Sequence, residues 1–445
     1  RQVSELEETR LQRVLRIYHY NAKRPFTDVD FEIQIEKTNT NDQACLVIDF
    51  GTSSSMVQVV NTAQASMNIV ALDLEEKHAG VELESILLYP ELQEGDHKFA
   101  FGEQAVNQMN IYPHNVVQSL KTIVNQNPNT EYHFIRVEKD NHGTENDFSV
   151  RMTAQELLQI FLQELKTRSE RAYRELSDIE VGKLGLEKNL MFERAIFTHP
   201  VELKNFGPLY TSAKNVGLTM DEDKRSFQRN CCIDESSAAL VSYIYSLFDS
   251  LPEEFEKKMI CVDIGGGTTE IAVLSLGGIV KDKSIKVAGD IFTSDIRYYM
   301  RQNHNLVIGE RSAERIKIEV GAANPELDEP PEDFAVRGRD LVTGIPKEIV
   351  VSYTEIAYAL DNTISKIEEA ILSALEMTPP ELSADIYRTG IYLAGGGSML
   401  RGLDKRISSK TKLPVWIAED PLRAVARGTS IALKNINQYQ FLIRD

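Results

Sequence analysis

Two stretches far apart in the chain share one order of apolar and polar positions. In each stretch a short apolar run, at residues 45–48 and 259–262, leads into a polar turn that contains glycine. A second apolar run, at residues 56–60 and 271–274, follows the turn. Short apolar runs bounded by turn residues are typical of buried strands. The pattern therefore predicts the same strand, tight turn and strand twice in one chain.

Helical and strand patterns alternate through the remainder, which predicts a soluble α/β protein. Residues 153–176 place apolar side chains at the spacing of an amphipathic helix. Residues 391–404 predict a buried strand, a triple glycine and a helix start. We also expect a loop at 177–191, a strand at 192–198, an exposed acidic loop with prolines at 325–335, a helix at 365–375 and a last helix that starts at 427.

Residues 1–43 form a separate pattern, which we interpret as an N-terminal appendage of helix and strand. A helical apolar stripe comes first, residues 29–35 alternate as a half-exposed strand does, and residues 38–42 are a polar linker. The stripe could pack on the body, meet a partner or the next subunit, or touch a membrane. Its glutamates at residues 5–8 weigh against the membrane, because surface-seeking helices carry a basic polar face.

The two predicted turns carry residue types that bind phosphate and magnesium. Glycines let a backbone approach a ligand closely, and the amides of such a turn can cradle phosphate oxygens. The candidates are Asp49, Gly51, Thr52 and Ser53 in the first turn and Asp263, Gly265, Gly266, Gly267 and Thr268 in the second. Asp49 and Asp263 are the expected magnesium anchors, mainly through its waters, because that ion dehydrates reluctantly. The pair predicts a nucleotide held between two facing hairpins.

A third glycine cluster strengthens this prediction. Gly395, Gly396, Gly397 and Ser398 follow a predicted strand, and a glycine turn at a helix N-terminus offers free amides and a positive dipole end to an anion. These residues would complete the contacts to the α-phosphate and the adenosine. A Walker-type phosphate loop is excluded, because the chain has no Gly-x-x-x-x-Gly-Lys-Ser/Thr run. The glycine spacing also misses the dinucleotide fingerprint.

Composition narrows the class of protein. The 445 residues are enough for two or more domains, and a net charge of −18 argues against binding to nucleic acid or anionic lipid by charge alone. The four cysteines and eight histidines show no metal-ligand spacing, so we expect buried thiols in a reducing cytoplasm and no structural metal. The chain has no run of 18 apolar residues, so no membrane span is predicted.

A family resemblance is carried by the segments 262–270, 275–279, 308–310, 313–317, 336–339, 419–421 and 425–428. Through these segments, residues 259–433 resemble the actin-like ATPase superfamily, and within it the MreB-type bacterial actins. The first half is more similar to the nucleotide-binding domain of DnaK-type chaperones, at 101–105, 115–121 and 234–239. In the last of these, Ser236 stands where both families usually have proline. The resemblance implies two duplicated ribonuclease-H-like domains around a nucleotide cleft, 44–250 and 251–445, each with a small inserted subdomain, the second around 300–375.

The resemblance also implies roles for individual side chains in ATP hydrolysis with magnesium. Glu235, helped by Thr268, would orient or activate the attacking water. Lys121 matches the chaperone lysine that contacts phosphate. Glu314 and Lys317 share one face of a predicted helix and would touch ribose and adenine. Plainer alternatives stay open: a first-turn carboxylate for Glu235, a solvated lysine for Lys121, and an exposed ion pair for the last two.

Three functions share such a fold, and the fold alone does not decide among them. A filament-forming cytoskeletal ATPase for cell shape or scaffolding is favoured, with slow magnesium-dependent hydrolysis coupled to polymerisation, because the second half matches a polymerising family. The alternative is a monomeric DnaK-like regulatory ATPase without a peptide-binding domain, and a sugar or acetate kinase is disfavoured. The expected partner is the protein itself, in the cytoplasm. A scaffold or membrane partner for residues 1–43, at the inner face of the membrane, is left open, and no nucleic acid is expected.

Overall fold

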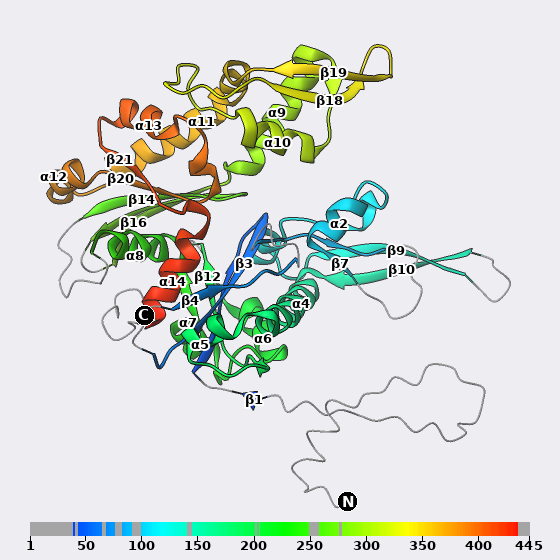
Figure 1. Ribbon diagram of the computed structural model, residues 1–445, viewed down its shortest axis with the longest axis vertical. Helices are drawn as coiled ribbons and strands as arrows, with labels where there is room; N and C mark the ends of the chain where they lie inside the picture. The colour runs from blue at the N-terminus through cyan, green and yellow to red at the C-terminus, as the bar shows by residue number, and fades with distance from the viewer. Residues whose placement is uncertain are drawn as a thin grey trace, which may run out of the picture. The chain divides into compact units, whose positions relative to one another are not determined.

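The computed structural model describes residues 39–40, 43–64, 68–75, 82–90, 99–139, 145–200, 203, 205–248, 258–275 and 278–434 (Figure 1). All of them belong to one compact unit, Asn39–Asp445. The helix and strand that we predict within residues 1–38 lie outside the described residues. Within the predicted polar linker, Asn39–Thr40 forms the short strand β1, which pairs in parallel with β11 (Leu190–Met191).

The first predicted hairpin is present at the centre of a six-stranded sheet. β2 (Ala44–Phe50) and β3 (Ser54–Asn61) pair antiparallel around the glycine turn, and both are buried almost throughout. β12 (Ala195–His199) and β13 (Cys232–Asp234) continue the sheet in parallel beyond β2, and β4 (Ile69–Ala71) and β5 (Glu82–Glu84) pair with β3. A continuous apolar run is what a strand covered on both faces requires.

The second predicted hairpin repeats this arrangement. β14 (Met259–Ile264) and β15 (Thr269–Ser275) pair antiparallel. Their sheet runs in the order β16-β15-β14-β20-β21, with β16 (Gly278–Ile285), β20 (Ile391–Ala394) and β21 (Val415–Ile417). In both sheets the first hairpin strand continues into two parallel strands from later in the chain, and the second gains an antiparallel neighbour. The duplicated fold is therefore confirmed.

Two helices connect the halves, and each packs on the sheet of the other half. α8 (Glu235–Phe248) lies against β14, β15 and β20, whereas α14 (Ala424–Lys434) lies against β2, β3 and β12. The two helices also pack on each other, as Figure 1 shows. They cross at Gly428, where a Cβ would lie 1.6 Å from the carbonyl oxygen of Ala238. Only glycine lets the two backbones approach this closely.

The long helix of each half starts at the same kind of cap. α4 (Ala154–Glu175) confirms the predicted helix at 153–176, and Thr153 and Glu156 form a capping box at its start. α11 (Tyr353–Glu376) includes the helix predicted at 365–375 but starts much earlier, at a capping box of Ser352 and Glu355. α4 follows β10 (Glu145–Thr153) and α11 follows β19 (Pro346–Val351), and each of these strands is the second of an antiparallel pair. The similarity of the two halves therefore extends beyond the two central sheets.

The predicted loop at 177–191 is wrong in part, because α5 (Asp178–Leu184) lies within it. Ser177 and Glu180 form a third capping box, which stabilises the start of this helix although its apolar pattern is short. The other helices are α2 (Gly102–Gln108), α3 (Leu120–Gln126), α6 (Gly207–Asn215), α7 (Lys224–Cys231), α9 (Gly289–His304), α10 (Glu310–Val320), α12 (Pro380–Thr389) and α13 (Leu403–Thr411), with 3₁₀ turns η1 (Pro113–Asn115), η2 (Gly396–Met399) and η3 (Pro421–Arg423). The other strands are β6 (Leu87–Leu88), β7 (Ala100–Phe101), β8 (Val116–Val117), β9 (Glu131–Lys139), β10 (Glu145–Thr153), β17 (Leu306–Val307), β18 (Phe334–Asp340) and β19 (Pro346–Val351).

Three further expectations concern the cysteines, a membrane span and the acidic loop. All four cysteines are free and buried, as predicted, and burial raises the pKa of Cys45 to about 12. Among the described residues, no helix combines the length and the apolar character needed to cross a bilayer. The residues of the predicted loop at 325–335 are irregular up to Phe334, where β18 begins.

Candidate functional site

A cavity of about 730 Å³ lies between the two hairpin turns and the 395–397 turn. Most of the predicted site residues line it. From the first half these are Asp49, Gly51, Thr52, Ser53, Lys121 and Glu235, and from the second half Asp263, Gly265, Gly266, Thr268, Glu314, Lys317, Gly395, Gly396 and Gly397. Two predicted residues, Gly267 and Ser398, are not among its lining. The fold thus brings sequence-distant candidates to one place.

The two hairpin turns press against each other at the floor of this cavity. Ser53 Oγ donates to both carboxylate oxygens of Asp290, at 2.8 and 3.0 Å. The Asp290 amide in turn donates to the carbonyl oxygen of Gly266 at 2.7 Å, which fastens the start of α9 to the second turn. A Cβ at Gly266 would lie 1.9 Å from Ser53 Oγ. Close packing of the two halves therefore explains this glycine as directly as phosphate contact does.

A buried ion pair is part of the cavity lining. The ammonium of Lys121, from α3, contacts the carboxylate of Glu235 at the start of α8, and both side chains are about nine-tenths buried. Burial by itself lowers the pKa of Lys121, but the carboxylates of Glu235 and Asp49 outweigh it, so the pKa lies above its usual value. Lys121 is therefore charged and is not the solvated lysine of the plainer alternative.

Several carboxylates lie close together around this pair, so their negative charges repel one another. Burial raises the pKa of Asp263 well above its usual value, and the neighbouring charges of Glu235 and Asp49 raise it further, against the effect of Lys121. Asp49 itself accepts a hydrogen bond from Thr198 Oγ1 at 2.6 Å. A cation would relieve this crowding, which fits a magnesium site. Within the described residues, no three histidine, cysteine or acidic side chains are placed to hold a metal directly.

Glu314 and Lys317 lie on α10 and form the i, i+3 ion pair of the plainer alternative, at 2.7 Å, while also lining the cavity. Both contact α9, because Thr293 Oγ1 donates to Glu314 at 2.6 Å and Lys317 Nζ donates to the carbonyl oxygen of Gly289 at 3.2 Å. The pair therefore joins α9 to α10 beside the cavity. Its proposed contact with ribose and adenine stays a prediction.

The 395–398 turn differs from the expectation. β20 leads into the 3₁₀ turn η2, and the α-helix begins only at Leu403, so the glycines do not form the N-terminus of an α-helix. The amide of Gly395 donates to the carbonyl oxygen of Pro421. Ser398 is fully buried, and its hydroxyl donates to the carbonyl oxygen of Gly395 at 2.7 Å. Ser398 thus stabilises the turn rather than facing a ligand.

Several lining residues were missed by the sequence reasoning. Asp290 follows an apolar segment and a glycine at the start of an amphipathic helix, and this signal could have found it. Burial raises the pKa of Asp290, while the Ser53 hydrogen bond and Lys317 oppose the rise. Three exposed apolar side chains also line the cavity, namely Ile318, Met399 and Leu422, with exposed fractions of 61%, 56% and 44%. They lie on three separate elements, α10, η2 and η3, and single apolar residues of this kind give no sequence signal.

The second half of the chain is similar in sequence to a known protein family. The model of the MreB/Mbl protein family matches residues 250–441. The cell shape-determining protein Mbl of Bacillus cereus is 50% identical over 177 residues, which are 40% of this chain and 53% of that protein. The cell shape-determining protein MreB of Escherichia coli is 44% identical over 189 residues, which are 42% of this chain and 54% of that protein. The chain spans about half the length of these curated relatives.

Solved structures extend the match to the first half. The crystal structure of MreB5 of Spiroplasma citri bound to ADP aligns with a TM-score of 0.63 and 26% identity, and covers 89% of this chain and 99% of that chain. The chain has the actin-like fold, and its second half matches the MreB/Mbl family. The AMPPNP-bound structure of the same MreB5 aligns with a TM-score of 0.62 and 25% identity, and covers 89% of this chain and 98% of that chain. The first half, outside the family-model match, therefore shares the actin-like fold, and the findings do not support the DnaK-like alternative.

Proposed function

We propose that this MreB-type protein binds and slowly hydrolyses ATP with magnesium, and that it polymerises into cytoskeletal filaments that act in cell shape or scaffolding. The observation that carries the proposal is the charged centre of the cavity. A buried Lys121–Glu235 pair and the carboxylates of Asp49 and Asp263 lie beside two facing glycine turns. Support also comes from the bound ADP and AMPPNP of the two Spiroplasma citri MreB5 structures.

Each residue of the centre has a proposed task. Bound ATP with magnesium would supply the phosphoryl group and the charge that neutralises it in the transition state. Asp49 and Asp263 would hold the ion mainly through its waters. Glu235 would accept a hydrogen bond from the attacking water, with Thr268 beside it, and Lys121 would add positive charge at the phosphates.

Two other parts of the cavity suit the rest of a nucleotide. The amides and hydroxyls of Thr52 and Ser53, with the second glycine turn, would contact the β- and γ-phosphates. Ile318, Met399 and Leu422 also line the cavity, and they expose apolar surface that a planar base would cover. Glu314 and Lys317 stand beside this surface and would contact the ribose and adenine.

Self-assembly is supported by the hairpin of β18 and β19 in the second half. Its tip exposes Val342 and Ile345, with exposed fractions of 79% and 62%, and Val350 on β19 is 60% exposed. Exposed apolar side chains grouped in one hairpin favour a protein contact. One heterologous contact that does not close into a ring yields an open polymer. Because the net charge is −18, assembly should strengthen with added salt or magnesium through screening.

The test is sedimentation of the full chain with ATP, AMPPNP, ADP or no nucleotide, over a range of protein and salt concentrations, with electron microscopy of the pellets. We expect concentration-dependent pelleting and filaments with ATP. Val342→Lys combined with Ile345→Lys should abolish pelleting. Ile179→Lys, on α5 and 72% exposed, is the matched control and should not. A chain that stays monomeric at tens of micromolar in every condition would contradict the filament proposal and favour a monomeric regulatory ATPase.

We propose that the protein is located in the cytoplasm. Residues 1–43 would attach its filaments to a scaffold or to the inner face of the membrane. Deleting residues 1–38 keeps β1 and tests this separately. If the deletion changes pelleting with vesicles but not without them, the segment is a membrane attachment. Unchanged behaviour in both assays would contradict that role.

A further inference from the structure

A second contact between the halves is made by residues outside the cavity lining. Arg311, in the first turn of α10, donates from Nη1 to Asn107 Oδ1 at 2.8 Å. Its Nη2 lies 3.8 Å from Glu103 Oε1. Glu103 and Asn107 are one helical turn apart on α2, in the first half. One guanidinium group thus joins α10 to one face of α2, across the two halves of the fold.

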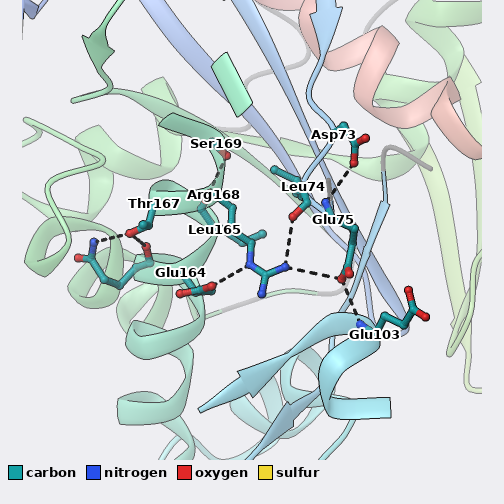
Figure 2. A network of polar contacts seen from close by, with 10 residues as sticks. Asp73, Leu74, Glu75, Glu103, Glu164, Leu165, Thr167, Arg168 and Ser169 are labelled. Atoms are coloured by element: carbon teal, nitrogen blue, oxygen red, sulfur yellow. Dashed lines mark hydrogen bonds and ion pairs between the residues drawn. The ribbon is translucent and has the colours of Figure 1, made fainter. Parts of the chain in front are cut away.

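α2 is itself fixed to the long helix α4, as Figure 2 shows. Arg168 of α4 donates to Glu164 at 2.7 Å and to the carbonyl oxygen of Leu74 at 3.2 Å, and lies 3.7 Å from Glu75. Glu75 accepts a hydrogen bond from the amide of Glu103 at 3.1 Å, in the first turn of α2. The Arg168 side chain is only 12% exposed. α2 therefore offers Arg311 a rigid partner.

Charge around the contact makes the arginine important for closure. Glu84, Glu75 and Glu103 of the first half face Glu314 of α10. Burial raises the pKa of Glu84, and the charges of the other three carboxylates raise it further, whereas Arg311 lowers it. Without Arg311, carboxylates would face one another across the rim and repel. With it, the same surfaces attract.

The contact also lies close to the nucleotide-facing side of α10. Arg311 precedes Glu314 by three positions, so both lie on one side of the helix. Glu314 and Lys317 line the cavity, whereas Arg311 lies beyond its lining. Any movement of α10 away from α2 would carry these two residues with it.

We propose that Arg311 and the Glu103–Asn107 face of α2 form a latch that holds the cleft closed at its rim and sets how long a nucleotide stays bound. This proposal rests on the proposed function for its nucleotide, though not for the contact itself. The Arg311 side chain is 66% exposed and Glu103 is 32% exposed, so the latch is weak and screened by salt. It therefore tunes release rather than blocking it.

The first experiment measures release of a fluorescent ADP analogue from the full chain after a chase with unlabelled ADP. Arg311→Ala should release it about three- to tenfold faster, which matches the loss of one charged hydrogen bond and one exposed ion pair. Added salt should speed release from the original protein more than from the variant. The control is Arg315→Ala, because Arg315 lies on the same helix but stacks on Phe334 of its own half, 5.3 Å from the ring centre.

Charge exchange gives a stricter test. Arg311→Glu should release the analogue faster than Arg311→Ala, because a fifth carboxylate joins the rim. Adding Glu103→Arg to Arg311→Glu should restore slower release, which a structural role of either residue alone would not produce. Equal release from Arg311→Ala and Arg315→Ala, or no rescue by the exchange, would overturn the latch.

A second measurement needs no nucleotide. Cysteines introduced at Gln104 on α2 and Glu319 on α10 can be labelled selectively, because the native cysteines are buried. Energy transfer between the labels should fall in Arg311→Ala and stay unchanged in Arg315→Ala. If neither the original protein nor any variant binds nucleotide, the proposed function fails. The distance between the labels on α2 and α10 then tests by itself whether Arg311 holds the two helices together. An unchanged separation in Arg311→Ala would overturn the latch.

Discussion

The two hairpin turns occupy equivalent places in the two halves but are built differently. The first turn, Gly51 to Ser54, has one glycine and presents hydroxyl groups, and Ser85 braces it with a hydrogen bond from its hydroxyl to the carbonyl oxygen of Gly51 at 3.0 Å. The second turn has three successive glycines and is closed by backbone bonds, including the amide of Gly265 to the carbonyl oxygen of Thr268. The same strand–turn–strand topology thus presents side-chain hydroxyl groups in one half and mainly backbone groups in the other.

The same division extends to the rest of the cavity. Lys121 and Glu235, the buried ion pair, both come from the first half. The second half contributes the turn with three glycines, the exposed apolar side chains of Ile318, Met399 and Leu422, and the charged side chains of Asp263, Glu314 and Lys317. The first half thus supplies the buried ion pair, the second half supplies the exposed apolar surface, and each half supplies one aspartate. The following predictions test that division, starting with the largest expected effect.

Asp263→Ala should abolish ATP hydrolysis, because it removes a proposed metal anchor and leaves the phosphate charge poorly compensated. Asp49→Ala, at the equivalent position of the first half, should have an effect of similar size if the two turns share the ion. Turnover of radiolabelled ATP is the measurement, with Asp333→Ala in the exposed loop before β18 as the control. Unchanged ATP turnover in Asp263→Ala would contradict the assignment of this cavity as the ATPase site.

Glu235→Ala should separate binding from chemistry. A group that positions water acts mainly in the transition state, so hydrolysis should fall by about 10²- to 10⁴-fold while ATP affinity persists. Calorimetric titration with AMPPNP and single-turnover hydrolysis measure the two quantities. A loss of affinity as large as the loss of rate would mark Glu235 as a structural partner of Lys121 instead.

Gly428→Ala tests the joint between the halves. The new Cβ would meet the backbone of α8, so the helices must separate, and we expect about 1–3 kcal/mol lower unfolding free energy. Gly182→Ala in α5 is the matched control, because no atom lies within 4 Å of its Cβ position and alanine favours a helix. It should raise stability by about 0.5–1 kcal/mol. Thermal unfolding distinguishes the two, and equal effects would contradict the close helix crossing.

The capping boxes should give the smallest effects. Thr153→Ala at α4 and Ser352→Ala at α11 should each cost about 1 kcal/mol of unfolding free energy. Hydrogen bonds from Thr153 lower the pKa of Glu156 below its usual 4.5. A lowered carboxyl pKa stabilises the fold above about pH 4.5, and the gain is lost as the pH falls through the folded pKa. Denaturant titrations should therefore show the cost of Thr153→Ala shrinking below that pH.

Local patterns were enough to predict the hairpins, the amphipathic helix at 153–176 and the three turns that line the cavity, because glycine turns and apolar periodicity act within a few residues. The resemblance added Lys121 and Glu235, whose ion pair joins residues 114 positions apart. Asp290 carried a local signal that was not used, and α5 was missed although its capping box is local. The contact of Arg311 with Asn107 spans 204 positions, so no local pattern could reveal it.

The contact between Ser53 and Gly266 also makes the substitutions that one turn tolerates depend on the residues of the other turn. A side chain at position 266 would have to push the Ser53 hydroxyl away from Asp290, and a bulkier residue at position 53 would meet the backbone of the second turn. Neither turn can drift in size alone. Substitutions in the two repeats are therefore tolerated as matched sets, and a chimera that exchanges one half for that of a distant relative inherits the mismatch at this point first.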